Sequence, residues 1–427
     1  MSAEAAAGTP SARQVATLFF SAFALVGAMS PYMALYFEAW GLSIAQISLL
    51  LAVPQLVRLV APSFWGWCAD RAADKGRLLV LGAAGTLLAS LLIALAQGSA
   101  GWLMLWLAIF HFCTAAHSPI GEAMALRVTA GDAGAYGRVR QWGSIGFILA
   151  VAGVGPLLDA SGVRWLTLPM ALLSLLLLAS AWRIARATAP AVVPASAPDL
   201  ESASATDSAT AGGGVQTAAA AAAPGPGVLS RLREPRLALF FLSCALMMFA
   251  HAALYGFYSL LLDRQGFSKA GIGLVWTLGV LAEIVLFRMQ HRIFGRYGAL
   301  PLLGFSMAVA AVRFVLIGLG DGHWLLVVLV QLMHAITFGV HHSAAMALLH
   351  RWFEPAAQGR AQALYATLGY GLGGAAGSLA AGAIWASAGP AWTFSVAGLA
   401  AAAGGLAVLA CQRLDRRAAW PVQGAGA

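Results

Sequence analysis

About a dozen apolar stretches, each roughly 20 residues long, follow one another between Arg13 and Arg417. A stretch of this length crosses the hydrocarbon core of a bilayer as a single α-helix. The chain is 60% apolar and only 10% charged, whereas a soluble globular domain carries about 25% charged residues. The sequence therefore excludes a soluble domain and predicts an all-α membrane protein.

The apolar stretches predict twelve transmembrane helices in two groups of six. The predicted spans are 15–37, 45–66, 78–97, 101–127, 138–160, 163–185, 236–262, 270–292, 299–319, 323–350, 360–386 and 390–412. Between the sixth and seventh spans, residues 187–235 are rich in Ala, Pro, Ser, Thr and Gly, which predicts a disordered cytoplasmic linker. The predicted domains are a tail (1–14), an N-terminal six-helix bundle (15–186), this linker, a C-terminal six-helix bundle (236–412) and a second tail (413–427).

The two groups of helices also resemble each other in sequence. At an offset of 222 residues, the Ala-Met-Ala-Leu of residues 123–126 recurs at 345–348, and Gly137-Arg138 recurs as Gly359-Arg360. Because six spans are an even number, both halves run through the membrane in the same direction. We therefore expect a parallel duplication of two pseudo-symmetric bundles around a central cavity.

Basic residues alternate between loops in a way that orients the chain. With the N-terminus in the cytoplasm, 20 of the 25 Lys and Arg residues fall on the cytoplasmic side and 3 on the opposite side. This asymmetry satisfies the positive-inside rule and predicts that both termini are cytoplasmic. The net charge of +9 would then meet anionic lipid headgroups and not nucleic acid.

Several motifs that would indicate an enzyme or a metalloprotein are missing from the sequence. The four cysteines are far apart and form no CxxC or Cys/His metal spacing, so we expect no disulfide and no metal. No P-loop, HExxH or GxSxG motif occurs. We therefore expect neither an enzyme nor a cofactor.

The predicted spans contain charged and imidazole residues, and six of these are singled out because they lie where hydrocarbon is expected. Each would cost about 3 kcal/mol at the bilayer centre unless it faced a partner or a wet cavity. Such residues mark substrate and ion pathways, which favours a transporter over a purely structural bundle. They are Arg58, Glu122, Arg140, Glu283, Arg313 and His334.

The loop after the second span carries a motif. It reads Gly-Trp-Cys-Ala-Asp-Arg at 66–71 and Asp-Lys-Gly-Arg at 74–77, which resembles the cytoplasmic signature GxLaDrxGrr of the major facilitator superfamily. The resemblance implies twelve helices in two pseudo-symmetric halves. It also implies a gating role for Asp70, Arg71 and Arg77, in a charge network that stabilises the outward-open state.

Within this superfamily the chain is similar to the phenylpropionate permease group, relatives of lactose permease. The segments that carry the resemblance are 136–144, 251–257, 278–283, Arg313 and 331–342. Lactose permease grips sugar with an acidic residue on its fourth helix and an arginine on its fifth, which implies substrate binding by Glu122 and Arg140. The acidic residue expected three positions after His334 is replaced by Thr337, so we assign proton coupling to Glu283.

Residue types and depth suggest the remaining roles. Glu283 lies near the middle of its span, where desolvation favours a neutral carboxyl, and Arg313 and His334 are its expected partners in proton coupling. A static Glu283–Arg313 salt bridge is the alternative. His251 and Tyr255, with Tyr258, form one stripe of the seventh span and could line a cavity for a partly apolar ligand.

Together these features predict a proton-coupled secondary transporter that imports a small organic solute by alternating access. An aromatic carboxylate resembling 3-phenylpropionate is the preferred substrate. Arg58, Arg140 and Arg313 are candidate anion-binding groups. For Arg58, pairing with a carboxylate of the protein is the alternative. A sugar or nucleoside proton symporter is the alternative. We expect a monomer in the bacterial inner membrane, with protons, a small-molecule substrate and lipid as its partners.

Overall fold

The computed structural model describes residues 8–130, 132–188, 228 and 230–419. All regular elements in this part of the chain are helical. In the first half they are α1 (Ala12–Met29), α2 (Met33–Ala39), α3 (Ile44–Val57), α4 (Ala61–Arg71), α5 (Lys75–Ala94), α6 (Ala100–Thr114), α7 (His117–Val128), α8 (Ala133–Ser161), the 3₁₀ turn η2 (Val163–Leu166) and α9 (Thr167–Thr188). The second half contains the turn η3 (Ser230–Arg233), α10 (Pro235–Arg264), α11 (Lys269–Tyr297), α12 (Ala299–Leu319), α13 (Trp324–Leu332), the π-helix η4 (Ala335–Val340), α14 (His341–Trp352), α15 (Pro355–Tyr365), the π-helix η5 (Ala366–Gly373) and α16 (Gly374–Ala419).

Helix starts follow from short polar side chains that precede the apolar runs. Ser11 and Ser43 each accept a hydrogen bond from the backbone N–H three residues later, and the Gln there bonds back, which completes a capping box. Asp74 and Ser268 cap α5 and α11 in the same way through one side-chain bond. These caps satisfy N–H groups that the first helical turn leaves without a partner.

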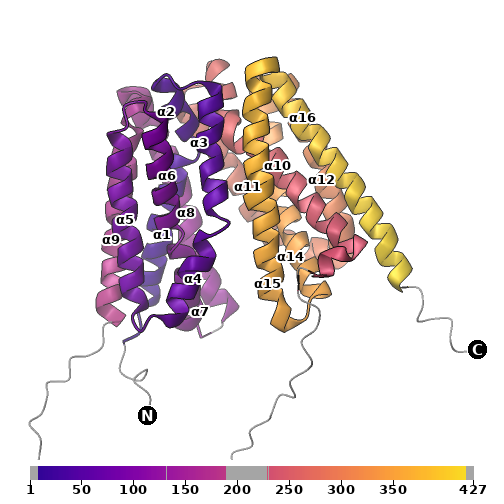
Figure 1. Cartoon of the computed structure of the whole chain (residues 1–427), viewed down its shortest axis with the longest axis horizontal. Helices are drawn as coiled ribbons and strands as arrows, with labels where there is room; N and C mark the ends of the chain where they lie inside the picture. Colours follow the sequence, from indigo (N-terminus) through magenta and orange to yellow (C-terminus); the bar gives the residue numbers. More distant parts are fainter. Residues whose placement is uncertain (1–7, 131, 189–227, 229, 420–427) are drawn as a thin grey trace, which may run out of the picture.

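In the described part of the chain the helices provide eleven candidate membrane spans, and they form two bundles that stand side by side (Figure 1). Residues 355–416 form one continuous stretch long enough for two spans, and it turns back at Gly389. Gly389 has φ +83° and precedes Pro390, a pair that reverses the chain without a loop. The fold class predicted from the sequence is confirmed.

The predicted domain boundaries lie partly outside the described residues. Most of the predicted linker (187–235), part of the first tail (1–14) and part of the second tail (413–427) fall there. In the described part, α9 continues to Thr188 and η3 leads directly into α10. The boundaries therefore remain predictions.

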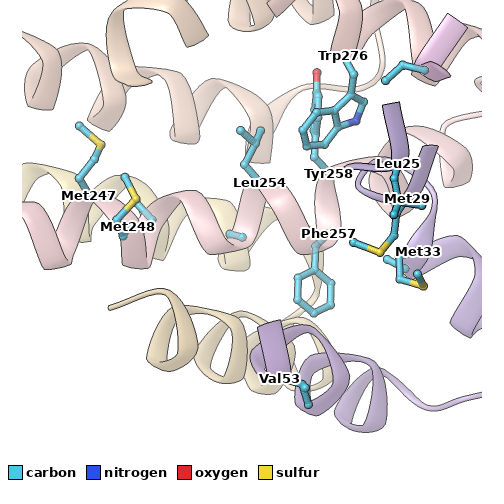
Figure 2. Packing of buried hydrophobic residues seen from close by; sticks show 14 of the residues in the cluster. Leu25, Met29, Met33, Val53, Met247, Met248, Leu254, Phe257, Tyr258 and Trp276 are labelled. Atoms are coloured by element: carbon cyan, nitrogen blue, oxygen red, sulfur yellow. The ribbon is translucent and has the colours of Figure 1, made fainter. Parts of the chain in front are cut away.

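Apolar side chains fill the interior and also cover the outer surface. Figure 2 shows part of a core that includes residues from both halves, among them Met29 and Met33 of the first and Phe257 and Trp276 of the second. Large apolar residues are also exposed, such as Leu274 at 64%. Such exposure suits a surface solvated by lipid.

All hydrogen bonds between the two halves in the described part lie at one end of the molecule. The start of α1 and the end of α16 both lie at the opposite end of the molecule (Figure 1). The Asp159 carboxylate of α8 accepts bonds of 2.8 and 2.9 Å from the backbone N–H groups of Lys269 and Ala270. Tyr32 Oη donates to the Lys269 carbonyl at 3.3 Å, and Arg264 pairs with Glu38 at 2.8 Å.

Glycine makes the close approach at this end possible. A Cβ on Gly155 would lie 2.7 Å from the Lys269 carbonyl oxygen and 2.8 Å from Ala270 Cα, closer than side-chain atoms normally approach backbone. The structure is therefore closed at the end remote from the termini, and we call the contacts of Asp159, Tyr32 and Arg264–Glu38 the remote-end contact.

Candidate functional site

A cavity of about 590 Å³ lies between the halves. Spans of both bundles contribute to its wall. Most of its lining is apolar or aromatic, including Phe23, Phe37, Phe147, Tyr255, Trp276, Phe338 and Tyr370. Of its lining residues only Arg58 and Glu283 carry a formal charge, and they come from opposite halves. This composition resembles a binding site for a small, partly apolar molecule.

The helices around this cavity are irregular at the depth of the cavity. The turn at 58–60 separates α3 from α4, and the turn at 115–116 separates α6 from α7. In the second half, η4 and η5 replace α-helix by π-helix. Interrupted helices and π-bulges expose backbone and side chains at functional sites, and in membranes they occur where they line a cavity.

The buried Arg313 of α12 organises the polar residues beside the cavity. Its side chain is fully buried. It donates to the Val330 carbonyl (2.6 Å), to His334 Nδ1 (3.1 Å), to Thr337 Oγ1 (2.9 Å) and to Gln331 Oε1 (3.3 Å). Among the described residues no carboxylate lies within ion-pair distance of Arg313. We call Arg313, His334, Thr337 and Glu283 the C-half cluster.

These hydrogen bonds fix the tautomer of His334. A guanidinium has only N–H donors, so Nδ1 of His334 must accept, and the neutral ring carries its proton on Nε2. Nε2 lies 3.7 Å from Glu283 Oε1, which is beyond normal hydrogen-bond distance. Glu283 Oε1 is buried and has no hydrogen-bond partner among the described residues. His334 therefore lies between the two charged groups that the sequence analysis paired directly.

His251 continues this polar chain on α10. Its Nδ1 lies 3.0 Å from the Met247 carbonyl, so Nδ1 donates and Nε2 can accept from the Thr337 hydroxyl at 3.5 Å. His251 is fully buried and does not line the cavity. Tyr255 does line it, stacked on Trp276 with ring centroids 6.0 Å apart. Tyr258, on the same predicted stripe, is buried away from the cavity.

Glu122 and Arg140 form a closed pair in the first half. Arg140 Nε lies 3.0 Å from Glu122 Oε1, and Tyr136 donates to Glu122 Oε2 at 2.5 Å. The guanidinium also lies 4.4 Å from the Phe23 ring, which belongs to the cavity wall. The two charged side chains are about one-third exposed but do not line the cavity. We call Glu122 and Arg140 the N-half pair.

The signature residues after the second span lie on the surface at the end where the halves make no hydrogen bond. Arg77 pairs with Asp74 at 3.1 Å, and Arg71 lies over the Trp67 ring at 4.4 Å. Asp70 is exposed, and no ion pair of it occurs in the described part of the chain. In this structure, which is closed at the remote end, the gating network implied by the resemblance is therefore not formed. The gating role of these residues remains a prediction.

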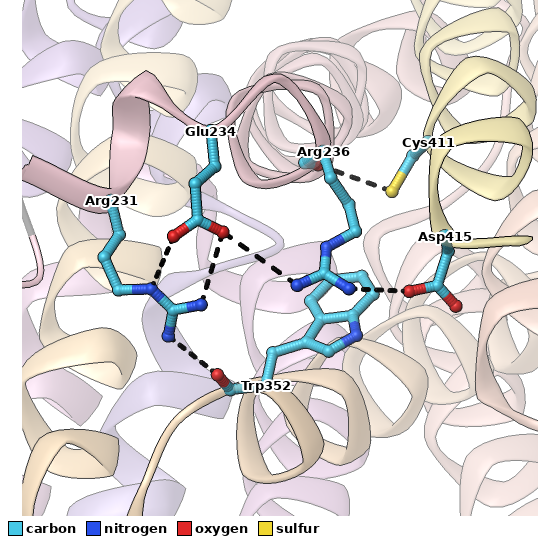
Figure 3. Close-up of polar contacts among 6 residues, drawn as sticks. All are labelled: Arg231, Glu234, Arg236, Trp352, Cys411 and Asp415. Atoms are coloured by element: carbon cyan, nitrogen blue, oxygen red, sulfur yellow. Dashed lines mark hydrogen bonds and ion pairs between the residues drawn. The ribbon is translucent and has the colours of Figure 1, made fainter. Parts of the chain in front are cut away.

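The second half carries its own polar cluster at that same end (Figure 3). Arg231 donates to Glu234 at 2.8 Å and to the Trp352 carbonyl at 2.8 Å, while Arg236 pairs with Asp415 at 2.8 Å. The hydrogen bond from Arg231 holds the pKa of the Glu234 carboxyl below its usual value. This cluster fastens the start of α10 to α14 and α16, within one bundle.

Some cavity residues were not predicted as site residues. Trp276 could have been found, because it lies seven residues before Glu283 and so on the same face of α11. Phe338 and Tyr370 could not, because their positions depend on the two π-helices. His111 also lines the cavity, near the turn that follows α6.

Twelve spans in two bundles around a shared, mainly apolar cavity define a secondary transporter of the membrane. Residues 13–396 match the family described as the MFS_1 like family, and the chain belongs to this family. It is a multi-pass membrane protein, and its relatives are transporters and not enzymes.

The chain is similar to transporters of different substrates. It is 29% identical over 371 residues to a protein named probable 3-phenylpropionic acid transporter from Escherichia coli (strain K12), covering 84% of this chain and 88% of that protein. It is 27% identical to the maltose permease of Geobacillus stearothermophilus, covering 83% of each. The solved nucleoside transporter NupG superposes with a TM-score of 0.75 at 16% identity, over 94% of this chain and 99% of that one, a likeness that concerns the fold alone.

Proposed function

We propose that this protein is a proton-coupled symporter that imports a small aromatic carboxylate, resembling 3-phenylpropionate, across the bacterial inner membrane. The observation that carries the proposal is the lining of the central cavity, which combines aromatic rings with one arginine and one buried glutamate. An aromatic acid needs apolar area for its ring and a cation for its carboxylate. The similarity to the probable 3-phenylpropionic acid transporter supports the same substrate class.

Glu283 is the proposed proton carrier. It lines the cavity, and one of its oxygens has no hydrogen-bond partner in the described part of the chain. A buried oxygen is left unbonded at lower cost on a neutral carboxylic acid than on a carboxylate. His334 is a poor proton acceptor at Nδ1, because protonation there would break its bond with Arg313. His334 and Arg313 are therefore proposed to position and polarise Glu283.

Alternating access would proceed by opening the remote-end contact and closing the opposite end. In the structure the halves are joined at the remote end by Asp159, Tyr32 and the Arg264–Glu38 pair. Closing the other end would bring Asp70, Arg71 and Arg77 against the second bundle, which is the proposed gating role of these residues. With both termini in the cytoplasm, the structure would be the inward-facing state of a monomer.

A sugar or nucleoside proton symporter remains the second candidate. The N-half pair is present and joined as an ion pair, and the maltose permease relative supports a sugar. Against this, neither Glu122 nor Arg140 lines the cavity in this state. A sugar would have to enter from the cavity and break the pair to use it.

Uptake into cells that express the protein tests the proposal. We expect labelled 3-phenylpropionate to accumulate, and accumulation to collapse with an uncoupler. Accumulation that survives the uncoupler would disprove proton coupling. Uptake of maltose or uridine without uptake of 3-phenylpropionate would favour the second candidate.

A further inference from the structure

We propose that Arg58 and Glu283 together make transport electroneutral, with one carboxylate bound at Arg58 and one proton bound at Glu283 in each cycle. The inference rests on the proposed function and adds the anion site and the stoichiometry. It follows from where the charges of the cavity lie, and from what each of the span arginines already contacts.

Arg58 is the available cation in the middle of the membrane. It follows the last residue of α3, at the centre of the candidate span 44–71, and begins the turn before α4. Pro54 within α3 and Pro62 at the start of α4 weaken the helix on both sides of this turn. The break exposes Arg58 to the cavity and places its guanidinium 5.8 Å from the Tyr370 ring of the opposite half.

The other two arginines inside the spans are occupied. Arg140 is held by Glu122 at 3.0 Å, and Arg313 has hydrogen bonds to four acceptors and no contact with the cavity. For Arg58, by contrast, the described residues provide no ion pair and no side-chain hydrogen bond. A guanidinium has five donors and binds a carboxylate with two parallel bonds. Arg58 is therefore the group able to take a ligand anion without breaking an existing bond.

His111 is a second donor on the same wall. It lies on α6, which packs against α3, and both residues line the cavity. No ring hydrogen bond of His111 is found in the described part of the molecule. A neutral imidazole keeps one N–H donor, so His111 can complete the carboxylate site beside Arg58. Tyr255, Trp276 and Phe338 of the other half can then receive the aromatic ring.

The charges of the cavity favour loading ligand and proton together. When ligand and proton have both been released, the cavity contains one cation, Arg58, and one anion, the Glu283 carboxylate. Binding a carboxylate alone leaves one excess negative charge, and binding a proton alone leaves one excess positive charge. Binding both restores neutrality, because the proton converts the Glu283 carboxylate to a carboxylic acid while the ligand anion faces Arg58.

An excess charge is costly in a closed cavity inside a bilayer, because the surrounding medium screens it poorly. The bundles therefore change state readily only when the cavity is empty or doubly loaded. The titratable and charged groups that face Glu283 add the same charge to every state, so the empty and doubly loaded states still carry equal net charge. His334 is neutral, Tyr255 and Tyr370 are phenols, and Arg313 remains a fixed cation in every state.

Proteoliposomes containing the full chain test the inference. A pH gradient, acidic outside, is imposed together with a potassium diffusion potential of about 0 or about −100 mV set by valinomycin. We expect uptake of 3-phenylpropionate to depend on the pH gradient and to be equal at both potentials. Uptake that rises with an inside-negative potential, or a current carried by the ligand, would overturn the charge balance.

The anion site is tested with Arg58→Gln. We expect uptake of 3-phenylpropionate to fall at least about tenfold, the effect of losing one charge-assisted bond, while binding of the neutral 3-phenylpropanamide is retained or improved. Arg292→Gln is the matched control, because Arg292 is exposed on α11 and outside the cavity. Equal preference for the acid over the amide in Arg58→Gln and in the wild type would overturn the assignment of Arg58.

Arg58→Lys covers the case in which the glutamine variant does not fold. Lysine keeps the charge but not the two parallel bonds, so we expect weaker binding and unchanged independence from the potential. Voltage-dependent uptake by Arg58→Lys would also contradict the inference. If the wild type takes up no 3-phenylpropionate at all, the proposed function fails, whereas voltage-dependent uptake by the wild type refutes only the charge balance.

Discussion

The N-half pair and the C-half cluster contain the same kinds of residue but arrange them differently. Glu122 and Arg140 touch at 3.0 Å and are about one-third exposed. Glu283 and Arg313 are more deeply buried and separated by the neutral ring of His334. The Glu122 carboxylate therefore has its counter-ion in direct contact, whereas Glu283 has no cation within ion-pair distance among the described residues except a protonated His334. The comparison teaches that spacing within a site, more than residue type, distinguishes the proposed proton carrier from a direct ion pair.

The largest expected effect separates the two carboxyls. Glu283→Gln should abolish uphill accumulation of substrate while sparing counterflow exchange, because the variant cannot release a proton. Glu122→Gln, the matched change in the N-half pair, should slow transport but leave an accumulation ratio above one in a pH gradient. Measurements of accumulation and counterflow in the same vesicles check both. Normal accumulation by Glu283→Gln would place the proton site elsewhere.

Removing the arginines should reveal the difference in burial. Arg313→Met leaves four acceptors without their donor, so we expect a loss of about 3 kcal/mol or more in the free energy of unfolding. Arg140→Met removes a partly exposed pair, for which we expect about 1 kcal/mol or less. Unfolding in detergent, followed by tryptophan fluorescence, checks the order. Equal losses would mean that the two clusters do not differ in structural role.

A smaller change tests whether the N-half pair takes any part in coupling. Tyr136→Phe removes the phenol that donates to Glu122 and should cost about 1 kcal/mol of stability. The ratio of accumulated to external substrate should remain that of the wild type, even if the rate of uptake changes. A lower ratio would move part of proton coupling into the first half.

The smallest expected effect concerns a partly exposed ion pair outside the membrane-spanning segments. Arg231 lowers the pKa of Glu234 from its usual 4.5, so this pair stabilises the fold above that pH and loses its effect as the pH falls through the lowered pKa. Glu234→Gln should therefore lower the free energy of unfolding at pH 7 by less than about 1 kcal/mol. The melting temperature should fall slightly. The difference should shrink as the pH is lowered below 4.5 and through the lowered pKa of Glu234.

Glu354→Gln is the control for this variant. Glu354 also precedes a proline at the start of a helix, α15, but has no ion pair in the described part of the chain. We expect the melting temperature of Glu354→Gln to be that of the wild type at pH 7 and at the lowered pH. A shift as large as that of Glu234→Gln would assign the effect to the helix start and not to Arg231.

Much of the fold was predictable because length and polarity of a span reflect the bilayer and not the rest of the protein. The apolar stretches located the twelve spans, and the proline beside Gly389 explains the turn between the last two. The breaks inside spans were not predicted. Pro54 and Pro62 gave a local signal for the turn at Arg58, whereas the π-helices η4 and η5 contain no proline.

The site was predictable in its residue types but not in its contacts. Glu283, Arg313 and His334 were expected to lie near one another, and the structure brings them together with His334 between the charges. His251 and Tyr255 were expected to line one cavity, yet only Tyr255 does so. Helical spacing defines a face, but packing of neighbouring helices decides which residues of that face reach the cavity.

The remote-end contact has a consequence for how the surrounding solution influences the transporter. Its Arg264–Glu38 pair is 46% and 34% exposed, and the attraction between such charges weakens over a distance of about 8 Å at physiological ionic strength. Salt in the medium on that side should therefore loosen the seal and raise the share of molecules open to it. Labelling of a Ser30→Cys variant, which places a thiol in the cavity wall, with a membrane-impermeant reagent added on that side across a salt series would measure this. Labelling independent of salt would show that the seal does not depend on the Arg264–Glu38 pair.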